Sequence, residues 1–124
     1  LYLERGEMFA LYDQNILKTI CVVTDEGGKT IELKNIATDP QYQKQGYGKR
    51  LIRFISEHNA GKYDTLLVAT GERPLTIPFY AQNGFKYSHR IKDFFTDNYD
   101  HPIYEDGKQL VDMVYLRKEL SKSK

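Results

Sequence analysis

Several features that would assign this sequence to a class at once are scarce or missing. The 124 residues include one cysteine, Cys21, no tryptophan and four prolines. A single cysteine excludes an internal disulfide, a cysteine-based zinc site and an iron–sulfur cluster, and it favours a reducing compartment. No apolar run approaches the ~20 residues of a membrane-spanning helix, and no secretory signal pattern opens the sequence. We therefore expect a cytoplasmic protein with no membrane partner.

The sequence also lacks an excess of charge of either sign. Eighteen Lys and Arg against seventeen Asp and Glu leave a net charge of +1, and hydrophobic residues make up 40% of the chain. This composition is typical of a globular protein, and the length fits one domain over residues 1–124. A nucleic-acid-binding module is disfavoured because phosphate contacts need a strong basic field and, for single strands, aromatic platforms beside the cations. The three histidines are too far apart in sequence to indicate a metal site, so no metal is expected.

The pattern of apolar and turn residues predicts short strands and helices in alternation. β-Branched residues dominate 16–24, whereas 48–59 has helical spacing of its apolar side chains. The predicted fold class is α+β, with a mostly antiparallel mixed sheet and one βαβ crossover. The expected strands are 8–12, 16–24, 29–38, 65–70, 85–95 and 111–120. The expected helices are 48–59 and 74–83, and Pro78 moves the start of the second helix toward Thr76. Residues 25–28 are expected to form a hairpin loop, and residues 96–110 a long loop.

The segment Gln43–Arg50 carries the strongest chemical signal. Gly46 and Gly48 allow close approach of the backbone to a ligand, and the first N–H groups of the following helix attract anions. Between positions 41 and 62 there are five cations and one acid, Glu57; the cations are Lys44, Lys49, Arg50, Arg53 and Lys62. The pattern predicts a phosphate-bearing ligand. The alternative is a tight turn beside a solvated basic face. The spacing matches neither a Walker A loop nor a dinucleotide fingerprint.

The motif Gln43-x-x-Gly46-x-Gly48 resembles the Gln/Arg-x-x-Gly-x-Gly/Ala motif of the Gcn5-related N-acetyltransferases, the GNAT family. Asn35–Pro40 resembles the strand that precedes this motif in the family, and Pro78–Phe85 resembles its later helix-to-strand segment. The order of elements also fits, so the resemblance covers nearly the whole chain. It implies a GNAT-like acyl-CoA N-acyltransferase fold, of the small bacterial type, with N-terminal elements shortened or missing.

The resemblance implies that acetyl-CoA is the co-substrate. The pyrophosphate is then held by the motif and its neighbours, which are Gln43, Lys44, Gln45, Gly46, Tyr47, Gly48 and Lys49. The pantetheine arm pairs with the preceding strand at Ile36, Ala37 and Thr38. Tyr47 either shields the phosphates or has no role.

Two residues match catalytic positions of the family. Glu32, on the strand before the motif, matches the general base of the histone-acetylating members; the alternative is a solvent-facing strand glutamate. Tyr80 matches the helix tyrosine that donates a proton to the departing CoA sulfur; the alternative is a core aromatic. A base is needed because a lysine-like amine is protonated at pH 7. Cys21, in the middle of a strand, is not placed to form an acetyl-enzyme.

The segment Asp93–Gly107 is acidic and aromatic, with no Lys or Arg. Carboxylates beside aromatic faces suit a cationic acceptor; the alternative is an acidic loop that packs on the sheet or on a second subunit, as in a homodimer. The resulting hypothesis is an N-acetyltransferase that transfers acetyl directly to a primary amine of a small molecule, peptide or protein in a ternary complex. The alternative is a non-catalytic acetyl-CoA-binding or sensor domain of the same fold.

Overall fold

The computed structural model describes residues 6–38, 40–73, 76–105 and 107–120. The chain divides into two units, residues 1–66 with 119–124 and residues 67–118. The expectation of a single domain over 1–124 stays a prediction.

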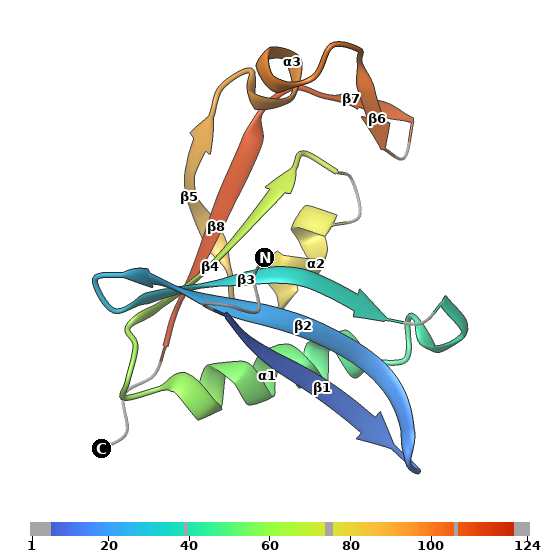
Figure 1. Ribbon diagram of the computed structural model, residues 1–124, viewed down its shortest axis with the longest axis vertical. Helices are drawn as coiled ribbons and strands as arrows, with labels where there is room; N and C mark the ends of the chain where they lie inside the picture. Colours follow the sequence, from blue (N-terminus) through green and yellow to red (C-terminus); the bar gives the residue numbers. More distant parts are fainter. Residues whose placement is uncertain (1–5, 39, 74–75, 106, 121–124) are drawn as a thin grey trace. The chain divides into compact units, whose positions relative to one another are not determined.

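The first unit contains an antiparallel meander of three strands (Figure 1). These are β1 (Gly6–Asp13), β2 (Ile16–Gly27) and β3 (Thr30–Thr38). Gln14 and Asn15, at φ 53° and 65°, make the tight turn between β1 and β2. The second hairpin turn lies at Gly28 and Lys29, so the predicted loop at 25–28 began three residues and ended one residue too early. The reason is an irregularity between Asp25 and Gly27 that lets β2 continue through the acidic residues.

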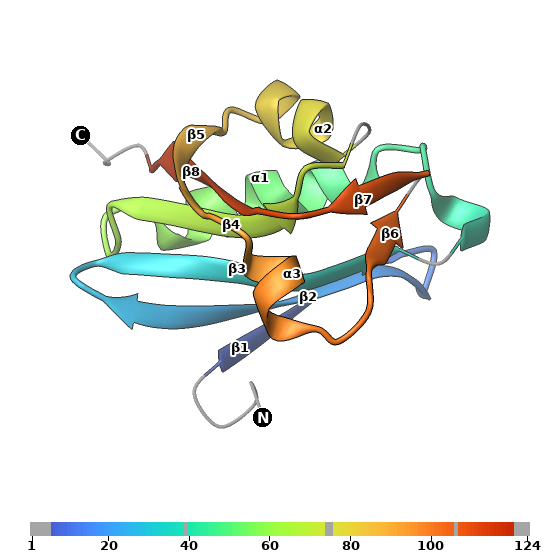
Figure 2. The same ribbon diagram turned by 90° about the horizontal axis from the view of Figure 1, so that it is seen from above.

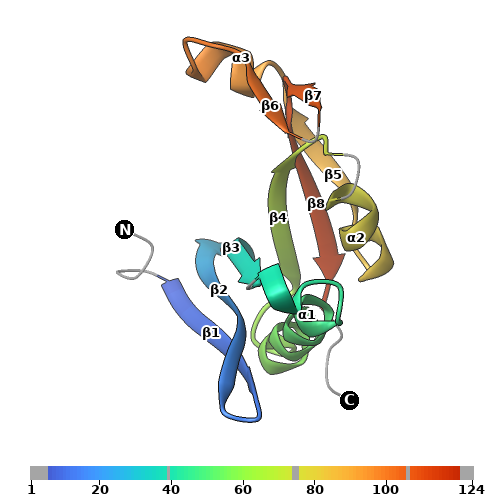
Figure 3. The ribbon, with the colours of Figure 1, turned by 90° about the vertical axis from the view of Figure 1, so that its right-hand side faces the viewer.

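Helix α1 (Tyr47–Asn59) lies along one face of this meander (Figure 3). The centre of its apolar face is buried, since Leu51, Ile52 and Ile55 are at most 1% exposed, whereas Phe54 at the edge of this face is half-exposed. On β1, the ring of Phe9 packs edge-on against Phe54 and His58 of the helix. The helix follows the predicted apolar spacing, begins one residue earlier than predicted and ends before a glycine turn at residue 61.

The second unit is built on the strand order β4-β8-β5. Strand β4 (Thr65–Gly71) enters it, β8 (Met113–Glu119) leaves it, and β5 (Lys86–Ile91) pairs antiparallel with β8. Helix α2 (Thr76–Gln82) lies beside β8 (Figure 2). It begins at Thr76 with Pro78 in its first turn, as the proline predicted, and it ends before Gly84 at φ 93°. Pro74, the earlier predicted start, lies outside the described residues.

Between β5 and β8 the structure departs from the predictions. The strand predicted over 85–95 ends at Ile91, and the predicted loop 96–110 contains helix α3 (Phe94–Asn98) and a hairpin of β6 (Ile103–Glu105) and β7 (Lys108–Leu110). The chain turns at Asp93, which has φ 58°. The N–H of Phe95 then donates to the carbonyl of Val111 at 2.8 Å, so this segment folds back on the start of β8.

The element order and the antiparallel ladders confirm the predicted α+β class. β3, α1 and β4 follow one another as the strand, helix and strand of the predicted crossover.

Candidate active site

The turn between β3 and α1 is shaped by Gly46. This residue is the N-cap of α1 and has left-handed backbone angles, φ 88° and ψ 5°. Among the residues that the structure describes, a Cβ atom built on Gly46 meets no other heavy atom within 4 Å. Glycine is therefore needed here for its backbone conformation and not because the protein crowds it. The space in front of the residue is open to a ligand.

The first turn of α1 exposes backbone N–H groups. The carbonyl of Gly46 accepts the first helical bond, from the N–H of Arg50 at 3.0 Å, and no side chain caps this helix end. The N–H groups of a first turn have no partner inside the helix, and they carry the positive end of its dipole. The side chain of Gln43 donates instead to the carbonyl of Thr38 at 3.2 Å. That bond ties the loop to the end of β3 and leaves the helix terminus available for an anion.

Three of the five predicted cations, Lys44, Lys49 and Arg50, lie at this terminus in sequence, whereas Arg53 lies farther along α1 and Lys62 follows its C-terminal end. All five side chains are exposed, and the single acid among them, Glu57, lies in the last turns of α1. The positive charge therefore adds to the helix dipole at the end where the glycine turn lies. A phosphate or pyrophosphate group is the ligand that this combination favours.

Two tyrosines bracket the glycine turn. Tyr42, the last residue of the short 3₁₀ helix η2 (Pro40–Tyr42), meets Tyr47 edge-on at 6.3 Å between ring centroids. The ammonium of Lys18 lies 3.4 Å from the centroid of Tyr42, and the guanidinium of Arg50 lies 5.6 Å from that of Tyr47. Aromatic rings therefore lie beside Arg50 of the basic segment and beside Lys18, which comes from a strand distant in sequence.

The hydroxyl of Tyr47 is engaged by a carboxylate of β1. It donates a hydrogen bond to Oδ2 of Asp13 at 3.0 Å, and this bond raises the pKa of the Tyr47 phenol above its usual range. Burial adds to the shift, whereas the positive charges of Lys18 and Arg50 oppose it. Tyr47 is thus a neutral phenol at physiological pH, held by a carboxylate of β1.

The end of β3 carries the three residues predicted to bind pantetheine. The register between β2 and β3 shifts between the pairs Ile20–Ala37 and Val22–Lys34, so β3 has an additional residue there. Such a bulge takes backbone groups out of the ladder and makes them available to an extended ligand. Thr19 stabilises the bulge, since its hydroxyl donates to the carbonyl of Ala37 at 2.9 Å and accepts from the hydroxyl of Thr38 at 2.8 Å.

Glu32 lies on β3 in a buried position. Only 6% of the residue is exposed, so the alternative of a solvent-facing glutamate is wrong. It is paired across the ladder with Thr24, which is fully buried, and its Oε2 lies 3.2 Å from the ammonium of Lys34. A buried carboxylate on the strand that leads into the glycine turn is chemically able to accept a proton.

Tyr80 lies in the second unit, on α2. The residue is 5% exposed, and its ring packs edge-on against Phe79 and Phe85 at 5.2 and 5.3 Å between centroids. The ring therefore contributes to packing, as the core alternative required. This packing also holds the ring in one orientation, as a proton donor requires. The packing is thus compatible with both roles, and the role of the hydroxyl as a proton donor stays a prediction.

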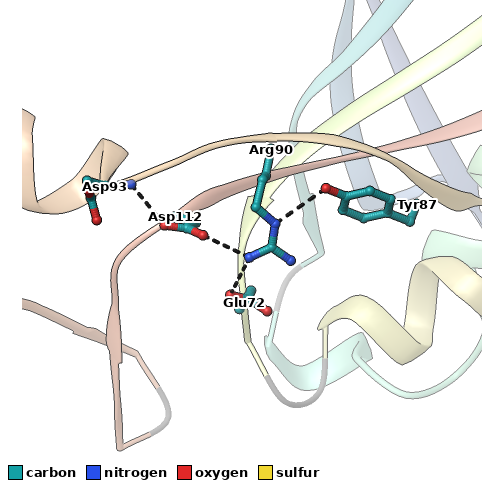
Figure 4. A network of polar contacts seen from close by, with 5 residues as sticks. All are labelled: Glu72, Tyr87, Arg90, Asp93 and Asp112. Atoms are coloured by element: carbon teal, nitrogen blue, oxygen red, sulfur yellow. Dashed lines mark hydrogen bonds and ion pairs between the residues drawn. The ribbon is translucent and has the colours of Figure 1, made fainter.

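The start of the acidic segment is anchored by Arg90 and Asp112, which lie outside it in sequence (Figure 4). Nη1 of Arg90 donates to Asp112 at 2.8 Å and to Glu72 at 3.3 Å, and Asp112 accepts the N–H of Asp93 at 2.8 Å. The bond from Asp93, followed by the ion pair with Arg90, lowers the pKa of Asp112. This network fixes the turn that leads into α3.

Part of the negative charge of this segment is compensated within the second unit. Glu105 lies 3.8 Å from the guanidinium of Arg73. Asp100 is within hydrogen-bond distance of Nδ1 of His101, at 2.8 Å. Asp97 and Asp100 are exposed, as are the neighbouring rings of Tyr99 and Tyr104. The segment thus presents carboxylates and aromatic faces to solvent. Asp106, another predicted acid of this segment, lies outside the described residues.

Cys21 is not suited to covalent catalysis. It is 1% exposed, and burial raises the pKa of its thiol to about 12, so the reactive thiolate is scarce at neutral pH. Across the described parts of the chain, no group of three or more His, Cys, Asp or Glu side chains could hold a metal ion. Over the same residues no helix has the length and hydropathy needed to cross a membrane.

The structure brings the predicted cofactor residues together in the first unit, along with Glu32, and it places Tyr80 in the second. Sequence reasoning missed Asp13, Lys18 and Tyr42, whose roles depend on strand pairing and had no local signal. It also missed the β6–β7 hairpin, for which the dipeptide Asp106-Gly107 was an available signal.

Comparison with known proteins agrees with this geometry. Residues 4–87 match the family described as an acetyltransferase (GNAT) domain. The N-acetyltransferase YvbK of Bacillus subtilis (strain 168) is 35% identical over 122 residues, which are 96% of this chain and 78% of YvbK. A B. subtilis acetyltransferase solved in complex with CoA is similar with a TM-score of 0.88 and 34% identity, over 96% of this chain and 80% of that one. A GNAT acetyltransferase from Elizabethkingia anophelis with acetyl-CoA bound has a TM-score of 0.84 and 32% identity, over 96% and 79%.

Proposed function

Because the chain belongs to the GNAT acetyltransferase family, we propose that it transfers the acetyl group of acetyl-CoA directly to a primary amine. The observation that carries this proposal is the uncapped start of α1 at Gly46, next to the exposed cations Lys44, Lys49 and Arg50. The pyrophosphate of acetyl-CoA binds at the N–H groups of Gly46 to Lys49. The pantetheine arm pairs with Ile36–Thr38, where the bulge frees the backbone. The CoA and acetyl-CoA complexes of similar proteins support the same ligand here.

In the proposed reaction Glu32 is the base. A primary amine is mostly protonated at neutral pH and must lose a proton before it attacks the thioester carbonyl. The proton passes to the Glu32 carboxylate, directly or through a water molecule. The amine nitrogen then attacks the carbonyl carbon, so that the C–N bond forms while the C=O π pair moves onto oxygen and a tetrahedral intermediate results. As the C=O bond re-forms, the C–S bond breaks with its electron pair going to sulfur, and the nitrogen loses its second proton to solvent.

Tyr80 is the proposed acid for the departing sulfur. A thiol has a pKa of about 8.5 and a phenol about 10, so a phenol that donates to the sulfur stabilises the charge that develops there. The acetylated amine and free CoA leave as products. No covalent acetyl-enzyme is involved, in keeping with the raised pKa of Cys21.

The proposal is tested by two measurements on the wild type. Acetyl-CoA at one hundred times its Kd is expected to stabilise the fold by about 2.7 kcal/mol, which is read as a rise in Tm. Release of free CoA, followed with a thiol reagent, is expected with at least one member of an amine panel. Unchanged Tm overturns the whole proposal. Binding without turnover on any amine favours an acetyl-CoA-binding or sensor domain instead.

For the acceptor we propose a cationic amine that is bound by the exposed acidic segment. The carboxylates of Asp97 and Asp100 and the rings of Tyr99 and Tyr104 are all exposed in this segment, a combination that attracts cations through charge and through ring faces. Such a site favours polyamines or basic peptides over neutral amines.

The acceptor proposal is tested with a charge-matched pair of variants. Asp97→Asn with Asp100→Asn is expected to raise KM for the best amine at least about threefold, since two surface charges contribute weakly but measurably. KM for acetyl-CoA should stay unchanged. The control, Glu7→Gln with Glu57→Gln, changes net charge equally at exposed positions elsewhere. If both pairs of variants raise KM for the amine equally, only the net charge of the protein matters and the acceptor proposal is overturned.

A further inference from the structure

We propose that the β1–β2 hairpin sets the conformation of the glycine turn, with Asp13 and Lys18 as positioning residues. They hold Tyr47 and Tyr42, which stand on either side of residues 43–46. This inference rests on the proposed function, because the conformation in question is the one that binds the pyrophosphate. Neither Asp13 nor Lys18 needs to touch the cofactor for this role.

The first contact fixes the start of the helix. Tyr47 is the first residue of α1 and Asp13 is the last residue of β1, 34 residues earlier, yet hydroxyl and carboxylate are 3.0 Å apart. Gly46, directly before Tyr47, has a left-handed backbone conformation that glycine adopts without strain. Because glycine also adopts other conformations easily, Gly46 does not by itself fix this one. A hydrogen bond on the next side chain restricts that freedom, and it thereby orients the N–H groups of the first helical turn.

The second contact fixes the other end of the turn. Lys18, on β2, is only 8% exposed, and its ammonium lies 3.4 Å from the ring centroid of Tyr42. A cation desolvated over an aromatic face is held more firmly than one at the surface. Because Tyr42 also packs edge-on against Tyr47, the two contacts form one assembly. The loop residues between the tyrosines are thus clamped at both ends by the same hairpin.

Electrostatics alone predicts the opposite effect for Asp13. A carboxylate close to a pyrophosphate repels it, so removing the charge of Asp13 would strengthen binding if charge were all that mattered. If Asp13 instead positions Tyr47, removing its hydrogen-bond acceptor weakens binding in spite of the lost repulsion. The two roles therefore give shifts of Kd in opposite directions, and the chemistry of the substitution separates them.

The test measures the Kd of acetyl-CoA by calorimetry on the full chain, at a temperature where circular dichroism shows each variant folded. Asp13→Ala and Tyr47→Phe each break the contact and are expected to raise Kd about tenfold, the effect of losing one charge-assisted hydrogen bond. Asp13→Asn keeps an acceptor and removes the charge, so its Kd is expected to stay within about twofold of wild type or to fall.

The chain offers a matched control at the far end of the same sheet. The hydroxyl of Tyr63 donates to Oδ2 of Asp25 at 3.0 Å, the same chemistry at the same distance, and that bond likewise raises the pKa of the phenol. Tyr63→Phe is therefore expected to resemble Tyr47→Phe in its effect on stability and to leave the Kd of acetyl-CoA unchanged.

The outcomes separate this inference from the proposed function. If the wild type does not bind acetyl-CoA, the proposed function falls and this inference falls with it. If the wild type binds and Asp13→Ala binds equally well or more tightly, the positioning role alone is overturned. The same holds if Tyr63→Phe weakens binding as much as Tyr47→Phe, since the effect would then be general loss of stability.

Discussion

Gly46 offers a test in which strain and ligand contact are separable. Its φ of 88° lies in the left-handed region, and an added Cβ meets nothing within 4 Å. Gly61, after the other end of α1, has φ 89° and equally open surroundings. Alanine at either position brings the same backbone strain and no clash within the protein. The two substitutions differ only in which end of the helix they affect.

The strain is worth about 1–2 kcal/mol, the cost of placing an L-residue with a Cβ in the left-handed region. For a chain of this size that lowers Tm by about 3–10 °C. Both Gly46→Ala and Gly61→Ala are expected to lose this amount in the absence of ligand. The free energy of unfolding, from urea titration, measures it independently of Tm.

With acetyl-CoA present the two variants should diverge. The methyl group of Gly46→Ala occupies the open space in front of the helix terminus, where the pyrophosphate is proposed to lie. If Kd rises a hundredfold, a concentration that stabilises the wild type by about 2.7 kcal/mol stabilises this variant by only about 0.4 kcal/mol. Gly61→Ala should keep the full gain, because its methyl group lies at the opposite end of α1.

The assay is a thermal shift with and without acetyl-CoA, supported by calorimetric Kd values for the wild type and both variants. Equal rises of Tm with acetyl-CoA in Gly46→Ala and Gly61→Ala would refute the reasoning, since the ligand would then not occupy the space in front of Gly46. Loss of the shift in both variants would show that strain in α1, and not local contact, controls binding.

Three further outcomes are expected. Tyr80→Phe keeps the ring packing and removes the hydroxyl, so kcat should fall at least about tenfold while Kd for CoA stays within a few-fold; normal kcat with lowered stability would make Tyr80 a core residue only. Glu32→Gln should reduce kcat/KM most at low pH, where the amine is most protonated, and a uniform loss across pH would remove its role as base. Asp112→Asn should destabilise the fold at pH 7, because the native state lowers the pKa of Asp112 and its ionised form contributes stability above the unfolded value of about 3.9. That contribution disappears as pH falls through the native pKa, so urea unfolding at pH 7 and pH 3 should show the difference between wild type and variant shrinking with acid.

The sequence by itself determined the parts of this protein whose causes are local. The glycine turn followed from Gly46 and the helix that begins after it, because both the left-handed conformation and the free N–H groups depend on neighbours in sequence. The start of α2 at Thr76 followed from the fixed φ of Pro78 in the same way. The proposed cofactor residues are nearly contiguous, so a sequence motif was enough to predict them.

Only the tertiary structure decided the features that depend on partners far along the chain. The alternation of polar and apolar residues along β3 did not decide whether Glu32 is buried or exposed, because that depends on what covers each face of the strand. The sequence predicted a loop over 96–110 because elements as short as α3, β6 and β7 owe their stability to tertiary contacts, such as that of Arg90 with Asp112, and not to propensity. The bond from Tyr47 to Asp13 joins residues 34 positions apart. No local pattern records such a pair, since the register of β1 on β2 and the packing of α1 on the sheet must both exist before the two side chains meet.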